Sequence, residues 1–449
     1  MSALGQDSEN HSHGGLDYLS ELPQARPHIH ETRKFPEGFL WGSASSSHQA
    51  EGGNNNDWTD WEKIPGHILD GSQSGRACDH YNRYEEDFDI AKSLNQNAQR
   101  ISVEWARIEP EEGKWDMDEV VHYRKVLQAI KDRGMQVMFT CWHFTLPKWF
   151  AAKGGWESPD AIDRFGRYVE LLASEYGDLV DIWITINEPM VYLLQSYGAG
   201  VWPPGVRNQF RSVHVFGKMT LAHRRAYKVI HRIVDARGGG KAKVGIAQNV
   251  ITFEPYRKQS IADTLFVWFA DRMFNHQFFI WSRKDSHDFI GINYYFHYRI
   301  KNRPEKPSQF FFEVHTENRE VSDLGWEINA PAIFDAIMGM TRYGKPIYIS
   351  EHGVANADDG KRPRIIVAAL KEVYHAIKAG VDIRGYFHWS LIDNFEWEKG
   401  FSGRFGLVAI DYTTMKRTPR RSAYVYAEIC KENGIPHTLL RYMGHGVRW

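Results

Sequence analysis

Eight short runs rich in β-branched and aromatic residues recur along this chain, separated by longer amphipathic stretches. This alternation is expected of βα units, which place parallel strands side by side in one sheet. The expected strands cover residues 39–46, 98–103, 136–141, 180–186, 243–247, 289–293, 346–350 and 385–389. Helical patterns lie at 118–134, 160–177, 216–238 and 362–380. Eight repeats closing on themselves predict an α/β protein, a single (β/α)8 TIM barrel.

The length of 449 residues fits one large barrel, because α/β barrels often exceed the usual domain size. We assign residues 35–449 to this barrel. Residues 1–34 are polar, lack apolar periodicity and are expected to form a mobile extension. The extension contains His11, His13, His28 and His30, so metal binding there is an alternative to a solvated tail.

The balance of charges and the cysteines limit the partners and the compartment. A formal net charge of −1 gives no attraction to nucleic acid or anionic membrane. No run approaches a membrane span, and the first residues lack the pattern of a signal peptide. Cys78, Cys141 and Cys430 are far apart and form no metal-binding spacing. We therefore expect a cytoplasmic protein without nucleic-acid or membrane partners, and the oligomeric state stays open.

Two expected strands end in a glutamate, within TINEP (185–189) and ISEHG (349–353). Active sites of such barrels lie at the carboxyl ends of the strands, so Glu188 and Glu351 should meet there. Cleavage of a glycosidic bond needs one protonated carboxylic acid at the leaving oxygen and one ionised carboxylate near the anomeric carbon. One strand-end glutamate is more often a cap or an ion-pair partner. Two in matched surroundings favour a two-carboxylate glycosidase.

Neighbouring strand ends suggest how the two glutamates divide the work. Arg100 and Tyr295 can hold Glu351 ionised and oriented through a guanidinium and a phenol hydroxyl. Glu188 has no such cation in its motif and should have the higher pKa. This difference is what a nucleophile and an acid/base require.

Further strand-end residues can bind a sugar. The side chains able to bracket several hydroxyls are Gln49, His143, Asn187 and Glu396. Trp389 and Trp397 could form an apolar floor and wall, with ordinary core packing as the alternative for each tryptophan. The strand-end histidines show no paired ligand motif such as HxH, so neither a metal nor any other cofactor is expected.

Together these segments resemble glycoside hydrolase family 1, the β-glucosidase and β-galactosidase family, from residue 35 to about 427. The strongest matches are FPEGFLWGSASSSHQAEG (35–52), RISVEWARIEP (100–110), TINEP (185–189), DFIGINYY (288–295), SEHG (350–353) and GYFHWSLIDNFEWEKGFSGRFGLVAIDY (385–412). The resemblance implies that Glu188 is the acid/base, Glu351 is the nucleophile, and no cofactor takes part.

The resemblance also implies roles for the surrounding residues. Substrate-binding roles fall to Gln49, His143, Asn187, Tyr295, Trp326, Trp389, Glu396 and Trp397. Trp389 would lie beneath the sugar and Trp326 would form the platform for the leaving group. Arg100 and Tyr295 would hold the nucleophile. Because Glu188, Glu396 and Trp397 are all present, the chain looks like an O-glycosidase for unphosphorylated sugars.

The chain departs from the family pattern in four places. Phe144 follows His143 where the family usually has Trp, and the nucleophile motif reads SEHG instead of TENG. The stretch 253–286 reaches the sixth strand sooner than usual, and the polar extension has no family counterpart that we can place. The short stretch contains seven large aromatic residues: Phe266, Trp268, Phe269, Phe274, Phe278, Phe279 and Trp281. They either pack on the barrel or line a widened, apolar flank of the cleft.

The sequence thus predicts a retaining β-glycosidase acting on terminal β-D-glucosides, and also on galactosides and fucosides, through a covalent glycosyl-enzyme. Transglycosylation to an acceptor is a closely related alternative. A non-catalytic sugar-binding barrel and a metal-dependent hydrolase are alternatives of other classes. The sequence does not distinguish glucose from galactose, because Gln49 and Glu396 can serve either C4 epimer.

Overall fold

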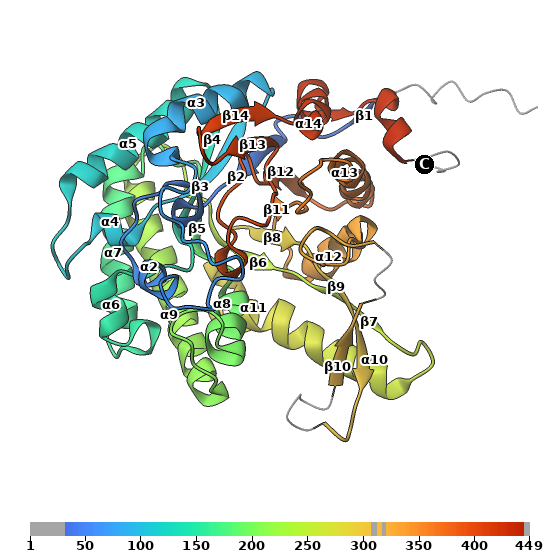
Figure 1. Ribbon diagram of the computed structural model, residues 1–449, viewed down its shortest axis with the longest axis horizontal. Helices are drawn as coiled ribbons and strands as arrows, with labels where there is room; N and C mark the ends of the chain where they lie inside the picture. The colour runs from blue at the N-terminus through green and yellow to red at the C-terminus, as the bar shows by residue number, and fades with distance from the viewer. Residues whose placement is uncertain (1–31, 307–311, 317–319, 444–449) are drawn as a thin grey trace, which may run out of the picture.

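The computed structural model describes residues 32–306, 312–316 and 320–443. Within them, parallel strands close a barrel in the order β11-β12-β2-β3-β4-β5-β6-β8 (Figure 1). These strands are β2 (Leu40–Ala44), β3 (Ala98–Ser102), β4 (Gln136–Trp142), β5 (Ile182–Asn187), β6 (Val244–Asn249), β8 (Ile290–Tyr294), β11 (Ile347–His352) and β12 (Ile383–Trp389). The predicted barrel is confirmed, and every expected strand overlaps one of them.

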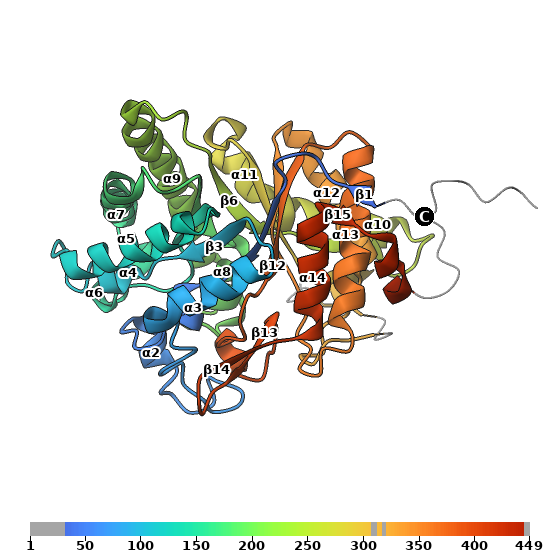
Figure 2. The same cartoon turned by 90° about the horizontal axis from the view of Figure 1, so that it is seen from above.

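A helix follows each barrel strand and covers the outside of the barrel (Figure 2). These helices are α3 (His80–Ser93), α5 (Met117–Asp132), α7 (Ala161–Tyr176), α9 (Gln209–Val234), α11 (Gln277–Ser282), α12 (Ile333–Met340), α13 (Arg362–Lys378) and α14 (Arg421–Glu432). The helix expected at 216–238 begins earlier, because Asn208 caps it by accepting from the backbone N–H groups of Phe210 and Arg211. Its first turn carries no apolar periodicity, since Phe210 is exposed.

Two apolar layers hold the barrel together. Ile182 and Ile184 of β5 belong to a cluster inside the barrel, with Leu40, Met138 and Phe387 from other strands. Trp183 faces the opposite side and belongs to the larger cluster between strands and helices. This alternation follows from the two-residue period of a strand, and it explains why barrel strands contain near-continuous apolar runs.

A small sheet outside the barrel repeat was not predicted. Its strands, in the order β10-β9-β7, are β7 (Thr252–Pro255), β9 (His297–Asn302) and β10 (Phe312–His315). Helix α10 (Ile261–Asp271) packs against β7 and β9 and extends away from the barrel (Figure 1). The strands are short and only partly buried, so their apolar pattern is weak. Strand β7 and helix α10 fall in the 253–286 stretch in which the sequence departs from its family, whereas β9 and β10 follow that stretch.

The aromatic residues of that stretch have three different surroundings, of which only two were expected. Phe278 and Phe279 are buried against the barrel, as ordinary packing predicts. Trp268 and Trp281 are 63% and 53% exposed. A short π-helix, η4 (Arg272–His276), lies between α10 and α11 and contains Phe274, which lines the cleft at the barrel mouth.

A short strand near the start of the described chain pairs with one near its end. Arg33 and Lys34 form β1, which pairs antiparallel with β15 (Gly434–Ile435). The remainder of the expected extension, including His11, His13, His28 and His30, lies outside the described residues apart from Thr32. None of the helices in the described ranges combines the length and apolar character needed to cross a membrane.

Candidate active site

Glu188 lies where β5 ends and α8 (Pro189–Leu193) begins. Pro189 has no N–H to continue the strand ladder and suits the first position of a helix. The Glu188 Oε1 accepts hydrogen bonds from Asn293 Nδ2 at 2.8 Å and from Asn249 Nδ2 at 3.2 Å. Burial, and next the negative charge of Glu351, raise the pKa of Glu188 to about 8. The side chain is therefore poised to hold a proton at neutral pH.

Glu351, on β11, has very different neighbours. Its Oε1 accepts a charged hydrogen bond from Arg100 Nη1, and its Oε2 accepts from the Tyr295 hydroxyl at 2.8 Å. A guanidinium and a phenol both favour and orient an ionised carboxylate. The expected contacts of Glu351 with Arg100 and Tyr295 are present.

Arg100 connects three strands at the bottom of the cleft. It is 1% exposed and donates to Asn187 Oδ1 at 2.7 Å, to the Ser350 carbonyl at 3.1 Å and to Thr140 Oγ1 at 3.3 Å. Its position is thus fixed by β4, β5 and β11. A shorter or differently shaped cation would lose part of this set.

The backbone after Glu351 explains the glycine of the SEHG motif. A Cβ at Gly353 would lie 1.9 Å from the Trp389 carbonyl oxygen, so no larger residue fits. The unusual His352 is buried, and its Nδ1 lies 2.7 Å from the Tyr386 hydroxyl. Histidine here therefore has a polar partner in the barrel wall.

Gln49, His143, Asn187, Trp326, Trp389, Glu396 and Trp397 line one cleft together with Glu188, Tyr295 and Glu351. Of the selected residues, only Arg100 is absent from its lining, because it lies beneath Glu351. Residues from six of the barrel strands or the loops that follow them thus meet at one mouth.

The polar groups of the cleft are already oriented toward one another. Gln49 Nε2 donates to Glu396 Oε2 at 3.3 Å, and Asn187 Nδ2 lies 3.3 Å from His143 Nε2. Burial, with the negative charges of Glu398, Glu351 and Glu188, raises the pKa of Glu396 well above its usual value. Burial and the positive charge of Arg100 lower the pKa of His143 well below its usual value, so the imidazole is neutral. A neutral imidazole can exchange a hydrogen bond with a hydroxyl group.

The two tryptophans expected to form the floor and wall, Trp389 and Trp397, flank His143. Its ring is nearly parallel to that of Trp389, with centroids 6.1 Å apart, and to that of Trp397, at 6.0 Å. His48 stacks on Trp397 at 5.6 Å, and its Nε2 lies 2.8 Å from Glu62 Oε1. The Trp397 ring is thus packed against His48, whose own orientation is fixed by Glu62.

Phe144, where the family usually has tryptophan, is part of an aromatic group that includes a residue we had not selected. Its ring lies 5.2 Å from Trp397 and 4.9 Å from Trp202. The Trp202 Nε1 donates to Glu398 Oε2 at 2.5 Å, which fixes that ring. Trp202 therefore supplies aromatic surface beside the smaller Phe144.

Sequence reasoning gave no role to Asn249 and Asn293, which donate hydrogen bonds to Glu188. Each stands at or near the end of a barrel strand, β6 and β8, and that position was the available signal. It missed most of the apolar lining as well, namely Val191, Leu194, Ile251, Phe296, Tyr298 and Phe405. Phe274, one of the aromatic residues considered for an apolar flank, does line the cleft.

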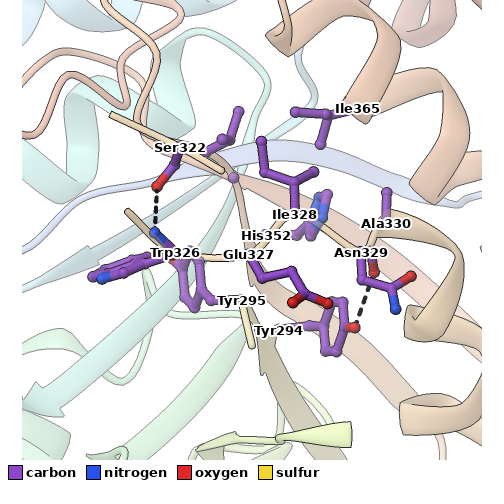
Figure 3. Close-up of a pocket in the computed structure, with 12 residues that line it drawn as sticks. Tyr294, Tyr295, Ser322, Trp326, Glu327, Ile328, Asn329, Ala330, His352 and Ile365 are labelled. Atoms are coloured by element: carbon purple, nitrogen blue, oxygen red, sulfur yellow. Dashed lines mark hydrogen bonds between the residues drawn. The ribbon is translucent and has the colours of Figure 1, made fainter. Parts of the chain in front are cut away.

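A second, smaller pocket shares Tyr295 and Trp326 with the cleft (Figure 3). On its far side the Tyr294 hydroxyl donates to the Asn329 carbonyl at 3.0 Å, and the Trp326 N–H donates to Ser322 Oγ at 3.2 Å. These bonds fix the loop that presents Trp326 to the cleft. Trp326, the expected platform, thus lies at the boundary between the two cavities, in a loop that hydrogen bonds fix.

A closed (β/α)8 barrel with two carboxyl groups in unequal surroundings, among aromatic rings and hydroxyl-binding side chains, is the architecture of a glycoside-cleaving enzyme. Comparisons with known proteins identify the family. The model of glycosyl hydrolase family 1 matches residues 31–280 and 276–435. The match divides within the 253–286 stretch, in which the sequence departs from the family.

Beta-glucosidase A of Thermotoga maritima is 33% identical, over 90% of this chain and 99% of that protein. A beta-galactosidase of Pyrococcus woesei is 30% identical, over 89% and 98%. The solved structure of a beta-glycosidase from Pyrococcus horikoshii superposes with a TM-score of 0.86 at 37% identity, covering 93% of this chain and 100% of that chain. The chain belongs to glycosyl hydrolase family 1 and is an O-glycoside hydrolase, as its motifs predicted.

Proposed function

We propose that this hydrolase removes terminal β-D-glucosyl residues with retention of configuration, Glu188 serving as acid/base and Glu351 as nucleophile. The observation that carries this assignment is the contrast between their surroundings. Glu351 contacts Arg100 and the Tyr295 hydroxyl, whereas Glu188 accepts only neutral amide donors in the described residues. The first environment suits an ionised carboxylate and the second a protonated acid.

In the first step Glu188 gives its proton to the leaving oxygen while Glu351 attacks the anomeric carbon. The bond to the leaving group breaks and an ester to Glu351 forms. Gln49, His143, Asn187 and Glu396 hold the hydroxyls of the sugar, and Trp389 and Trp397 cover its apolar surfaces.

The second step uses the coupling between the two carboxyl groups. The negative charge of Glu351 raises the pKa of Glu188. Forming the ester removes that charge, so the pKa of Glu188 falls in the intermediate. Glu188, now ionised, takes a proton from water, which attacks the anomeric carbon and releases Glu351. One residue can therefore act first as an acid and then as a base.

The names of the relatives support glucosides and galactosides as substrates, since they include a beta-glucosidase and a beta-galactosidase. We also infer a reduced, cytoplasmic location, supported by the free and buried thiols of Cys78, Cys141 and Cys430.

A panel of nitrophenyl β-D-glucoside, β-D-galactoside and β-D-fucoside tests the function. Hydrolysis of the glucoside, with the β-anomer appearing first by proton NMR, is the expected result. The Glu351→Gln variant is the control and should show no turnover. If the α-anomer appeared first, the reaction would be inverting and the assigned roles would be wrong.

A further inference from the structure

The backbone is strained directly after His143. Phe144 has a φ of 74°, in the left-handed region that residues other than glycine rarely adopt. The Thr145 N–H donates to the His143 carbonyl at 3.0 Å, across this single residue. A positive φ combined with a bond between residues i and i+2 is characteristic of the rare, strained form of the γ-turn. Such a conformation persists only where the surrounding structure imposes it.

Two carboxyl groups hold the residues that follow this turn. The Thr145 hydroxyl lies 3.0 Å from each carboxyl oxygen of Glu104, to which it donates. The Leu146 N–H donates to Asp57 Oδ1 at 2.8 Å, and the Leu146 carbonyl accepts from the Asp57 N–H at 3.0 Å. The bond from Thr145 is the nearer of these to Phe144, and its acceptor is fully buried.

Glu104 is itself fixed in the barrel wall. It lies just after β3, and its side chain caps α4 (Trp105–Ile108) by accepting from the Ala106 N–H at 3.4 Å. Its backbone N–H donates to the Tyr123 hydroxyl at 3.1 Å. Glu104 is not part of the cleft lining described above. It can therefore affect a bound sugar only through the residues that it contacts.

Glu104 also contacts the segment that carries Gln49. Ser47 begins the short helix α1 (Ser47–Ala50), and its hydroxyl lies 3.4 Å from Glu104 Oε2. The Ser47 N–H donates to Ser102 Oγ at 2.8 Å, at the end of β3. One carboxyl group thus lies between the segments that supply two of the proposed sugar contacts. Its shorter hydrogen bonds are on the His143 side.

We propose that Glu104 is a positioning residue for sugar binding, which fixes His143 by holding the strained turn at Phe144 through Thr145. The inference rests on the proposed function, in which His143 binds a hydroxyl of the sugar. Without the bond to Glu104 the turn can relax, and the imidazole moves away from that hydroxyl. The two catalytic glutamates keep their own hydrogen bonds, so the loss should be specific to one sugar hydroxyl.

Variants at both ends of the bond test the link. Thr145→Val removes only the hydroxyl and should lower kcat/KM for nitrophenyl β-D-glucoside about tenfold, the scale of a lost buried hydrogen bond. Thr145→Ser keeps the hydroxyl and should remain close to wild type. Glu104→Ala removes the acceptor, and adding Thr145→Val to it should cause little further loss. A Thr145→Val variant as active as wild type, or losses that multiply in the double variant, would overturn the proposal.

Deoxy substrates distinguish positioning of His143 from a general loss of structure. Nitrophenyl β-D-glucosides that each lack one hydroxyl are assayed with wild type, His143→Ala and Thr145→Val. The hydroxyl that His143 binds is the one whose removal makes the loss in His143→Ala smallest. The loss in Thr145→Val should be smallest on that same substrate. An equal loss on every deoxy substrate would reduce the role of the bond to folding stability and overturn the proposal.

Glu109→Ala is the matched control for Glu104→Ala. Glu109 is also fully buried, and it accepts from Trp105 Nε1 at 2.8 Å and from the Gly113 N–H at 2.7 Å. Any loss in this control should be the same on every deoxy substrate, and a hydroxyl-specific loss there would contradict the proposal. Failure of the proposed function would be distinct, since wild type would then not hydrolyse nitrophenyl β-D-glucoside.

Discussion

Asn293 joins Glu188 to the strand that carries Glu351. Its Nδ2 donates to Glu188 Oε1 at 2.8 Å, and its Oδ1 accepts from Ser350 Oγ at 2.7 Å. Ser350 directly precedes Glu351, so one amide connects the acid to the side chain of the residue before the nucleophile. The relative position of the two carboxyl groups thus depends on a residue that itself carries no charge.

Replacing Asn293 by alanine should lower kcat/KM about tenfold, the scale of a lost buried hydrogen bond. The Asn293 bond lowers the pKa of Glu188, so its loss should move the basic limb of the pH profile to higher pH. Asn249→Ala removes the longer bond to the same oxygen and should produce a smaller shift in the same direction. A shift to lower pH in either variant would contradict the role given to these amides.

Glu188→Ala should separate the two chemical steps. Substrates with activated leaving groups, such as dinitrophenyl glucoside, need no acid and should still form the glycosyl-enzyme. Hydrolysis of that intermediate should slow, and added azide should speed it by attacking without general-base help. Glu351→Gln should be inactive with or without azide. The acid/base assignment fails if Glu188→Ala matches wild type on an unactivated alkyl glucoside.

The pH dependence of kcat/KM should be bell-shaped for an unactivated substrate. The basic limb reports loss of the proton from Glu188 and should have its midpoint near pH 8, because the pKa of this group is raised to about 8. Rates measured between pH 4 and 10 with methyl glucoside test this, and a profile without a basic limb would exclude Glu188 as the acid.

Burying Glu188 beside Glu351 should lower stability as the pH rises. Its folded pKa, about 8, exceeds the ordinary value of 4.5, so the folded state keeps a proton that the unfolded state loses. The stability linked to this proton is fully present below pH 4.5 and is lost as the pH rises toward 8. Glu188→Gln should therefore raise the free energy of unfolding by about 1–3 kcal/mol at pH 7.5 and little at pH 4.5.

Thermal or urea unfolding at those two pH values measures the difference. Glu170→Gln is a suitable control, because Glu170 is 52% exposed and pairs only with the exposed Arg232 within the described residues. A stabilisation by Glu188→Gln that does not change with pH would contradict the raised pKa.

Arg100→Lys should lower kcat about a hundredfold, because lysine cannot reproduce the fork that holds Glu351 and Asn187 together. The value of KM should change less, since most sugar contacts remain. Arg124→Lys, at an ion pair with Asp178 in which both side chains are over 40% exposed, should leave kcat unchanged. Circular dichroism in the near ultraviolet would establish that both variants fold. If Arg100→Lys had the same kcat as Arg124→Lys, the role given to Arg100 would be wrong.

The barrel and the catalytic pair could be predicted from the sequence because strands buried on both faces have long apolar runs, and each motif stands at a strand end. The sheet of β7, β9 and β10 could not, since its strands are short and partly exposed. The direction in which the Phe274 side chain projects could not be predicted from the sequence either. Phe274 lies within the π-helical segment η4, whose wider turn changes the helical period there, so the side from which Phe274 projects cannot be read from a 3.6-residue repeat.

The pairing of β1 with β15 has a practical consequence. Arg33 lies opposite Ile435, and the chain enters the barrel at the amino end of β2, so both ends of the described fold meet at the face opposite the catalytic mouth. A linker joined near either end would leave the mouth unobstructed. The two ends could also be connected to each other and the chain opened elsewhere, making this barrel a candidate for circular permutation or for attachment to a surface with its cleft outward.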